Sequence, residues 1–258
     1  MRISVITVVK NNERTIRQAI ESTLNQKGID LEYIVLDGMS TDNTLKIIDE
    51  YKDKITIFKS EKDRNLYHAL NKAIAMATGD VVAILHSDDV YATDTILKDV
   101  VEKFKDGHSI VYGDLAIVRH DDTRLTVRRW RSGHFKKYKM YLGWMPPHPA
   151  FFVRRDLYDR YGMFDTDIRI SADYDLMLRF MVNEGRSSCY LDRLIVKMRA
   201  GGTSNNTPLN IFRKMSDDYR VVKRHNLAGL FTMVMKKLSK VHQYAQVDNL
   251  KASGKRAK

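Results

Sequence analysis

The segment VVAILHSDD, residues 81–89, decides the fold. Its first five residues are continuously apolar, which is typical of a central strand buried on both faces of a parallel sheet. Two adjacent carboxylates, Asp88 and Asp89, follow this strand directly. Carboxylates are costly to place beside a core unless a cation or a hydrogen-bond donor meets them. The segment therefore predicts a central strand that ends at a polar site.

Strand-like and helix-like periods alternate in the chain before this segment. Short apolar runs predict strands, and apolar residues at helical spacing predict helices, the first of which Asn11 and Asn12 can cap. The strands are expected at residues 3–9, 31–36 and 55–58, and the helices at residues 16–24, 40–51 and 66–77. This order predicts an α/β fold with a mainly parallel sheet, helices on both faces, and ligands at the carboxyl ends of the strands.

The regular alternation ends after Asp114, where the sequence becomes polar and basic. A proline-rich loop at residues 144–149 and an amphipathic helix ending near Phe180 follow. From Pro208 onward two further helices are expected. The expected division is residues 1–115 and 116–207 as two halves of one domain, and residues 208–258 as a basic helical extension with a disordered tail.

The formal net charge of +12 is unevenly placed along the 258 residues. Residues 119–139 carry +6 and residues 213–258 carry +9, so the rest of the chain sums to −3. A near-neutral body with two basic patches fits anionic lipid or phosphorylated ligands at least as well as nucleic acid. No apolar stretch approaches the roughly 18 residues that a membrane-spanning helix requires, so any membrane contact is expected to be peripheral.

The cysteine content and the N-terminus indicate a cellular compartment. Cys189 is the only cysteine, so the chain can form no intrachain disulfide and offers no cysteine-based metal site. The N-terminus runs into a strand-like segment without the pattern of a secretory signal. We therefore expect a cytoplasmic protein, peripheral at the inner face of the plasma membrane.

Acidic residues also follow two other expected strands, Asp37 after residues 33–36 and Asp114 after residues 110–113. The adjacent pair at residues 88–89 is more informative, because two carboxylates can share a hard divalent cation with pyrophosphate oxygens. The plain alternative is that Asp89 or Thr93 caps a helix.

Four motifs, in this order and spacing, resemble those of family 2 glycosyltransferases. They are ISVITVVKNN (3–12), VLDGMSTDNT (35–44), the segment from GDV (79–81) to SDD (87–89), and ISADYDL (170–176). The resemblance covers roughly residues 1–205 and is nearest to bacterial enzymes of exopolysaccharide or O-antigen assembly, including the colanic-acid type. It implies an inverting enzyme of the GT-A fold, the Rossmann-like fold of nucleotide-diphospho-sugar transferases. Residues 1–115 would bind the nucleotide sugar, and residues 116–207 would bind the acceptor and carry the catalytic base.

The resemblance implies roles for five residues on the donor side. Val8, Lys10 and Asn11 would line the pocket of the nucleotide base. Asp37 would accept a hydrogen bond from the base, and Arg64 would approach the diphosphate. Lys10 departs from the family pattern, in which an aromatic residue is common at this position.

The resemblance also implies a metal site and a general base. Asp88 and Asp89 match the family's Asp-x-Asp-type element, with Asp89 as the direct ligand of Mn²⁺ or Mg²⁺ and Asp88 reaching the donor. His148 is a candidate for a further metal ligand, although a lone loop histidine is more often neither a ligand nor a diphosphate contact. Asp173 matches the base that deprotonates the acceptor hydroxyl, and its plain alternative is helix N-capping.

On the acceptor side, Trp130 and Arg131 belong to a segment, residues 130–135, that resembles the flexible part that such enzymes close over their substrates. A solvated basic loop is an equal alternative. Gly202, in GGTS (201–204), could belong to an acceptor-side loop or to a simple turn.

The resemblance implies a nucleoside-diphosphate sugar as donor, UDP-sugar first and GDP- or dTDP-sugars next, and a lipid-linked or oligosaccharide acceptor. The competing interpretations are a nucleotidyltransferase, a glycan-binding relative without catalysis, and a nucleic-acid-binding protein. The first lacks its glycine-rich loop at residues 7–14, and in the last the four acids would repel phosphate, so no nucleic-acid partner is expected. The apolar stripe at residues 227–244 is flanked by lysines, which predicts contact with an anionic membrane, with the domain itself, or with a second subunit in a homodimer.

Overall fold

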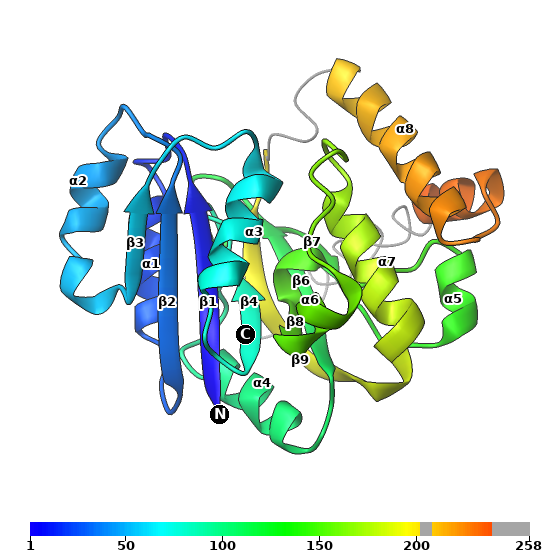
Figure 1. Ribbon diagram of the computed structural model, residues 1–258, viewed down its shortest axis with the longest axis horizontal. Helices are drawn as coiled ribbons and strands as arrows, with labels where there is room; N and C mark the ends of the chain where they lie inside the picture. Colours follow the sequence, from blue (N-terminus) through cyan, green and yellow to red (C-terminus); the bar gives the residue numbers. More distant parts are fainter. Residues whose placement is uncertain (202–207, 239–258) are drawn as a thin grey trace, which may run out of the picture.

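The computed structural model describes residues 1–201 and 208–238 (Figure 1). Within them one sheet contains the strands β1 (Arg2–Val9), β2 (Asp30–Asp37), β3 (Ile57–Ser60), β4 (Val81–Ile84), β5 (Val90–Tyr91), β6 (Ile110–Val118), β7 (Thr126–Trp130), β8 (Phe151–Arg154) and β9 (Ser188–Arg199). The α-helices are α1 (Ile16–Leu24), α2 (Thr44–Asp49), α3 (Leu66–Met76), α4 (Ile96–Lys105), α5 (Lys137–Tyr141), α6 (Asp156–Tyr161), α7 (Ala172–Glu184) and α8 (Pro208–Arg224). Short 3-10 helices are η1 (Lys52–Lys54), η2 (His148–Ala150) and η3 (Gly185–Ser187). A further helical segment, residues 230–238, is called the C-terminal helix below.

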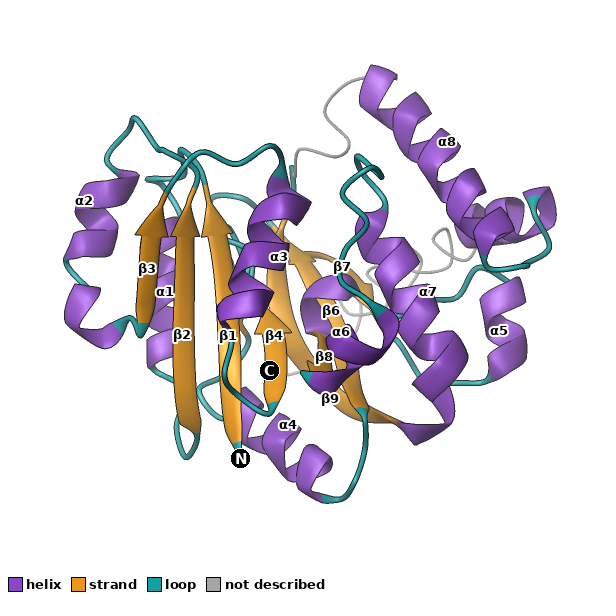
Figure 2. Cartoon of the chain, viewed as in Figure 1, coloured by secondary structure: helices purple, strands orange, loops and turns teal. Residues whose placement is uncertain are grey.

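The strand order is β3-β2-β1-β4-β8-β6-β9-β5, and β7 lies beside β6. Strands β3, β2, β1 and β4 are mutually parallel, and Figure 2 shows the arrowheads of β1, β2 and β3 at one edge of the sheet. Strand β8 runs antiparallel between β4 and β6, whereas β6 and β9 are parallel. The expected α/β fold is confirmed, and the first part of the chain supplies its block of four adjacent parallel strands.

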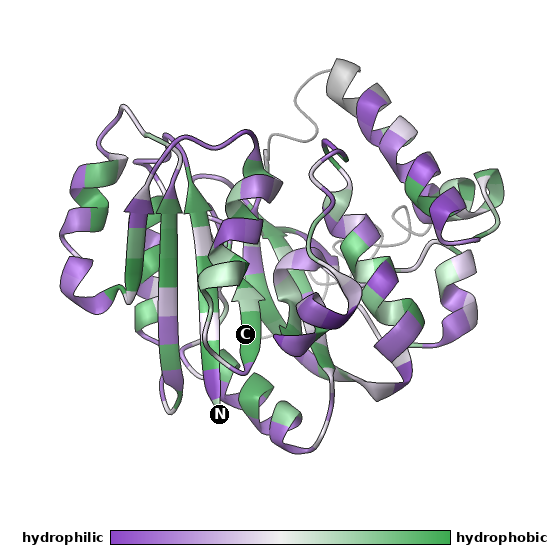
Figure 3. Cartoon of the chain, in the orientation of Figure 1, coloured by the Kyte–Doolittle hydropathy of each residue, from purple (hydrophilic) through white to green (hydrophobic). Residues whose placement is uncertain are grey.

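Alternate residues of the central strands face two separate hydrophobic cores. In β2, Ile34 and Leu36 pack into the core that α3, α6 and α7 cover, whereas Tyr33 and Val35 pack into the core beneath α1 and α4. All four residues of β4 are buried, as its apolar run predicts for a strand with both faces covered. Figure 3 shows these strands as the most hydrophobic part of the molecule.

Three local expectations were wrong. The N-cap of α1 is Thr15, so Asn11 and Asn12 do not cap this helix. Helix α2 begins at Thr44 rather than at residues 40–42. Asp114 lies inside β6 and not after it, because pairing with β7 and β9 extends the strand to Val118.

The C-terminal helix turns its apolar stripe away from the domain. Leu230, Phe231, Val234 and Leu238 are all exposed, Leu230 by 72%, and the fifth member, Val241, lies outside the described residues. Thr232 and Met233 are buried instead, and Lys236 points inward to Asp218. Across residues 1–201 and 208–238, no helix has the length and apolar character needed to cross a membrane.

Candidate functional site

The loops that follow β1, β2 and β4 are hydrogen-bonded to one another. The backbone N–H of Asn11 donates to Ser40 Oγ over 2.8 Å, and Asn11 Oδ1 accepts from the N–H of Thr41 over 2.8 Å. Asn12 Nδ2 donates to Ser87 Oγ over 2.8 Å. Asn11 has a φ of 49°, in the left-handed region that asparagine tolerates. These contacts gather the three loops at one edge of the sheet, the expected place for a ligand site.

Asp37 is fully buried at this edge, where β2 ends. Its Oδ2 accepts from the backbone N–H of Ser40 over 3.0 Å and from Ser60 Oγ over 2.6 Å. These donors hold the carboxylate in one orientation toward the adjoining loops.

The other donor-side residues differ in exposure. Val8 is half-buried against the core that α3 covers, whereas Lys10 and Arg64 are exposed. Arg64 precedes Asn65, whose Oδ1 accepts from the N–H of His68 over 2.9 Å and so caps α3. The two cations are therefore accessible on loops that follow β1 and β3.

The two carboxylates after β4 differ in burial and in their contacts with Arg199. Asp89 is only 1% exposed, and its Oδ1 accepts from the backbone N–H of Arg199 over 3.2 Å. Burial and the neighbouring Asp88 charge raise the pKa of Asp89. Asp88 is half-exposed, and its backbone oxygen accepts from the Arg199 guanidinium. The N-cap of α4 is Thr95, so neither Asp89 nor Thr93 caps that helix.

His148 lies in η2 and contacts His86, which follows β4 two residues after its end. The Nε2 atoms of His86 and His148 are 2.7 Å apart, so one ring donates the hydrogen bond and the other accepts it. Burial lowers the pKa of both rings to about 4, and their proximity contributes for His86. Both rings are therefore neutral at neutral pH. The charges of Asp88 and Asp173 partly oppose the lowering of the His86 pKa.

Asp173 lies in the first turn of α7, whose N-cap is Ser171, so Asp173 is not the capping residue. Tyr67 Oη donates to Asp173 Oδ1 over 3.5 Å and also to the backbone oxygen of Ile170. Burial raises the pKa of Asp173, against the opposing effects of the Tyr174 N–H and two lysines. A rigid helix therefore holds a carboxylate that readily accepts a proton.

The expected acceptor segment, residues 130–135, is only partly solvated. Trp130 ends β7, packs partly buried against the core, and has the Arg128 guanidinium 5.8 Å from its ring centre. Arg131 is exposed, whereas Ser132 is buried. Gly202 lies outside the described residues.

Asp175, two residues after Asp173, joins α7 to the end of α8. It is 1% exposed, and its oxygens lie 2.7 Å from Arg179 Nη2, 3.3 Å from Arg224 Nη1 and 3.0 Å from His225 Nε2. These hydrogen bonds and charges outweigh burial and lower the pKa of Asp175 to about 2. Asp175 therefore serves to hold the helix that carries Asp173.

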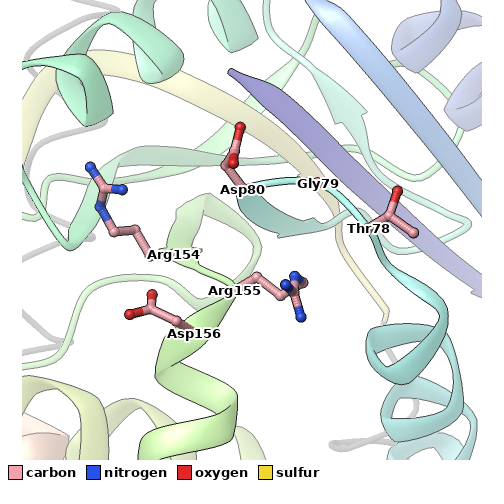
Figure 4. A pocket seen from close by; sticks show the side chains of 6 residues that line it. All are labelled: Thr78, Gly79, Asp80, Arg154, Arg155 and Asp156. Carbon is pink, nitrogen blue, oxygen red and sulfur yellow. The ribbon is translucent and has the colours of Figure 1, made fainter.

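A small pocket lies at the opposite edge of the sheet, where β4 begins (Figure 4). It is lined by Thr78, Gly79, Asp80, Arg154, Arg155 and Asp156. The backbone here is tight, because a Cβ on Gly79 would lie 2.9 Å from the Ser4 backbone nitrogen. Since Asp88 and Asp89 follow the other end of β4, this pocket is separate from the candidate site.

Sequence reasoning missed four residues of the site. His86 immediately precedes the residues 87–89 that drew attention, so its place at a strand end was an available signal. Tyr67, Arg199 and Lys236 reach the site from α3, β9 and the C-terminal helix, and no local pattern marks them.

Comparison with known sequences identifies relatives. The profile of the family "Glycosyl transferase family 2" matches residues 4–162. A PGL/p-HBAD biosynthesis glycosyltransferase of Mycobacterium bovis is 28% identical over 211 residues, which are 79% of each chain. The putative glycosyltransferase EpsE of Bacillus subtilis is 34% identical over 116 residues, 43% of this chain and 42% of EpsE.

Comparison with solved structures tests the fold. The mannosyltransferase PcManGT of Pyrobaculum calidifontis, in complex with GDP-Man and Mn²⁺, has a TM-score of 0.59 and 17% identity, covering 98% of this chain and 79% of its own. S. aureus TarS 1–349, in complex with UDP-GlcNAc, has a TM-score of 0.64 and 16% identity, covering 92% of this chain and 70% of its own. Against the longer TarS structure the chain spans 39% of that protein. At such low sequence identities the structural similarity is evidence of the fold alone. This similarity confirms the expected GT-A fold.

The family profile covers more than half of the chain. The matched residues include the hydrogen-bonded loops after β1, β2 and β4, with Asp37, Asp88 and Asp89. They also include the histidine pair of His86 and His148. The chain therefore belongs to glycosyl transferase family 2.

Proposed function

We propose that this chain is an inverting glycosyltransferase of bacterial surface polysaccharide synthesis. It moves a sugar from a nucleoside-diphosphate sugar, UDP-sugar first, to a hydroxyl of an acceptor glycan that is lipid-linked. The observation that carries this proposal is the set of hydrogen-bonded loops after β1, β2 and β4, which bring Asp37, Asp88 and Asp89 to one edge of the sheet in a chain of glycosyl transferase family 2. The UDP-GlcNAc bound to TarS supports a uridine nucleotide, and the GDP-Man bound to PcManGT keeps guanosine as the second choice.

Asp173 acts as the general base in this proposal. It takes the proton of the acceptor hydroxyl while that oxygen bonds to the anomeric carbon and the bond from this carbon to the nucleoside diphosphate breaks. The products are an inverted glycoside, a free nucleoside diphosphate and a protonated Asp173. The Tyr67 hydroxyl, 3.5 Å from Asp173 Oδ1, orients the carboxylate.

Asp88 and Asp89 fit a hard divalent cation, Mn²⁺ or Mg²⁺, through their oxygens. No cluster of three His, Cys, Asp or Glu in the described part of the chain could hold a metal alone, so diphosphate and water oxygens would complete the coordination. When bound, the cation would neutralise charge on the departing diphosphate. Asp89 is the ligand that the resemblance implies, but Asp88 is the more exposed of the two, and His148 Nε2 is engaged with His86.

Calorimetric titration with UDP, GDP and dTDP, each with Mn²⁺ and with EDTA, tests the donor and metal assignments. We expect Mn²⁺-dependent binding of one nucleotide, and a loss of affinity of at least about tenfold in Asp89→Ala, because a carboxylate beside the cation is removed. Asp88→Ala is measured in parallel, since the larger loss identifies the direct ligand. Asp106→Asn, an exposed carboxylate at the end of α4, is the control. Absence of binding by all three nucleotides would refute the proposed function.

The acceptor side of the proposal comprises Trp130, Arg131 and Gly202. Trp130 is the last residue of β7, which pairs with β6, and Arg131 follows it, next to the buried Ser132. The exposed Arg131 could meet an anionic group of a lipid-linked acceptor. The proposed place of action is the cytoplasmic face of the membrane.

Contact with an anionic membrane is the second part of the proposal. The C-terminal helix, which carries the exposed Leu230 and Phe231, contacts α5, since Thr232 Oγ1 donates to the Tyr141 backbone oxygen. Helix α5 adds the exposed Tyr138 and three nearby lysines, Lys136, Lys137 and Lys139. Apolar side chains ringed by lysines suit an anionic bilayer surface.

Sedimentation with vesicles tests this surface. The double substitution Leu230→Glu and Phe231→Glu should weaken binding to phosphatidylserine-containing vesicles by about tenfold or more, because two apolar side chains are lost and two negative charges added. Val182→Glu, an exposed apolar position on α7, should change binding little. Unchanged binding of the double variant would exclude the membrane. Loss of a dimer in sedimentation velocity would instead assign the stripe to a second subunit.

A further inference from the structure

The C-terminal helix is held against the domain at defined points. Thr232 is fully buried, and its Oγ1 donates to the Tyr141 backbone oxygen over 2.8 Å. Gly143, with a φ of 71°, lies so close to the helix that an added Cβ would be 2.6 Å from the backbone nitrogen of Lys236. The close approach at a glycine and the buried hydroxyl together fix where the Lys236 side chain starts.

The side chain of Lys236 extends into the domain rather than into solvent. Its Nζ lies 3.0 Å from Asp218 Oδ2 and 3.3 Å from the centre of the Tyr174 ring. The side chain is only 13% exposed, whereas the next residue, Lys237, is exposed. Burying an ammonium group costs free energy unless charges and an aromatic face compensate it. Lysine at this position therefore calls for an explanation beyond surface charge.

Tyr174 is the residue after Asp173 in the first turn of α7, so the ammonium lies over the ring of the residue that follows the proposed base. Lys236 favours the charged form of Asp173, while burial lowers the pKa of Lys236 against the opposing charges of Asp218 and Asp173. Several other groups also face Asp173 from the elements around it. They are Tyr67 of α3, His86 after β4, and Lys214 and Asp218 of α8. Among the charged side chains, Lys236 contributes the largest stabilisation of the Asp173 carboxylate, and Asp218 opposes it.

We propose that Lys236 is a positioning residue of the transfer reaction: its ammonium group, held over the Tyr174 ring, fixes the first turn of α7 and acts on Asp173 in that turn. The C-terminal helix thereby completes the catalytic site. This inference rests on the proposed function, in which Asp173 must be deprotonated to accept the proton of the acceptor. It assigns the helix a chemical role that is separate from the apolar stripe on its outer side.

A purely structural role for Lys236 makes a different prediction. If Lys236 only joined the C-terminal helix to α8 through Asp218, either single substitution would lower stability and leave the ionisation of Asp173 unchanged. If its charge acts on Asp173, the two substitutions must shift that ionisation in opposite directions, because the two side chains carry opposite charges. The pair therefore provides its own matched control.

The experiment is a carbon-13 NMR titration of the whole chain labelled in its aspartate carboxyl groups. The Asp173 signal is the one that disappears in Asp173→Asn. Lys236→Met should raise the Asp173 midpoint by about one pH unit, and Asp218→Asn should lower it, whereas Lys236→Arg should leave it near the wild-type value. With the donor that the calorimetry identifies, the acid limb of the transfer rate against pH should move with these midpoints, about tenfold in rate per unit below them.

Unshifted midpoints in Lys236→Met and Asp218→Asn would overturn the role of Lys236. Thermal unfolding of each variant shows whether it is folded. Gly143→Ala provides a second test, because the added Cβ displaces the C-terminal helix without removing the lysine side chain. That variant should shift the midpoint in the same direction as Lys236→Met. The proposed function fails separately, if Asp173→Asn still transfers sugar at the wild-type rate, and the titration result would then stand on its own.

Discussion

Replacing Asp173 with asparagine should lower kcat for sugar transfer by at least about a hundredfold and leave nucleotide affinity almost unchanged. Asparagine has the shape of aspartate, but its amide cannot accept the proton of the attacking hydroxyl. The base is needed only when the acceptor attacks, so the donor should bind the variant as well as the wild type. Tyr67 can still donate to the amide oxygen, which preserves the local geometry seen at 3.5 Å.

The measurement pairs transfer kinetics at saturating donor with calorimetric binding of the nucleotide. Asp167→Asn is a suitable control, because Asp167 is an exposed carboxylate in the loop before α7. An equal loss of nucleotide affinity in Asp173→Asn would show that this residue binds the donor or supports the fold. Activity should also fall as pH decreases through the raised pKa of Asp173, since protonation removes the base.

Replacing Asp175 with alanine should lower the free energy of unfolding by about 3 kcal/mol, because it removes a buried carboxylate and leaves Arg179 and His225 without their hydrogen-bond acceptor. The carboxylate bridges Arg179 of its own helix and His225 after α8, and both contacts are lost. Urea unfolding followed by circular dichroism measures the change. Asp159→Ala is the control, because Asp159 is 67% exposed and its Arg155 partner is 3.8 Å away, so its loss should matter little.

The contribution of Asp175 has a defined pH dependence. Its pKa in the folded protein is about 2, below the value of about 3.9 in an unfolded chain. The unfolded state therefore binds the proton first, so the stabilisation is complete above about pH 4 and is lost as pH falls toward 2. The difference in stability between wild type and Asp175→Asn should shrink over this range. A difference that stays constant from pH 6 to pH 2 would contradict the assignment.

The parallel half of the fold could be predicted because each strand carries its own signal. Residues 81–85 are apolar on both faces, and the helices around them have clear periodicity. The second half could not be predicted, because β8 has four residues and exists through antiparallel pairing with β4 and β6. Strand β7 lies in a basic stretch and is defined by its pairing with β6. Such pairing depends on partners far away in the sequence.

The candidate site was predictable to the same extent. Asp37 ends a strand, and Asp88 and Asp89 follow another. Asp173 lies in the first turn of a helix, so the position of each carboxylate along the chain makes it a candidate. The different contacts of Asp88 and Asp89 involve Arg199, which approaches from β9. Lys236 reaches Tyr174 only because Gly143 allows the C-terminal helix to approach closely. Neither contact follows from local pattern.

The hydrogen bonds among the loops after β1, β2 and β4 have a consequence for the thermodynamics of donor binding. Asn11 and Asn12 hold residues Ser40, Thr41 and Ser87 in place before any ligand arrives. The ordering entropy of these loops is therefore lost during folding and not during association. Binding of the nucleotide should therefore require little further ordering of these loops. The substitutions Asn11→Ala and Asn12→Ala should weaken nucleotide binding mainly through a more unfavourable entropy of binding. If the nucleotide binds at this preorganised edge as proposed, a substrate-induced change of shape is expected in the second half of the chain instead.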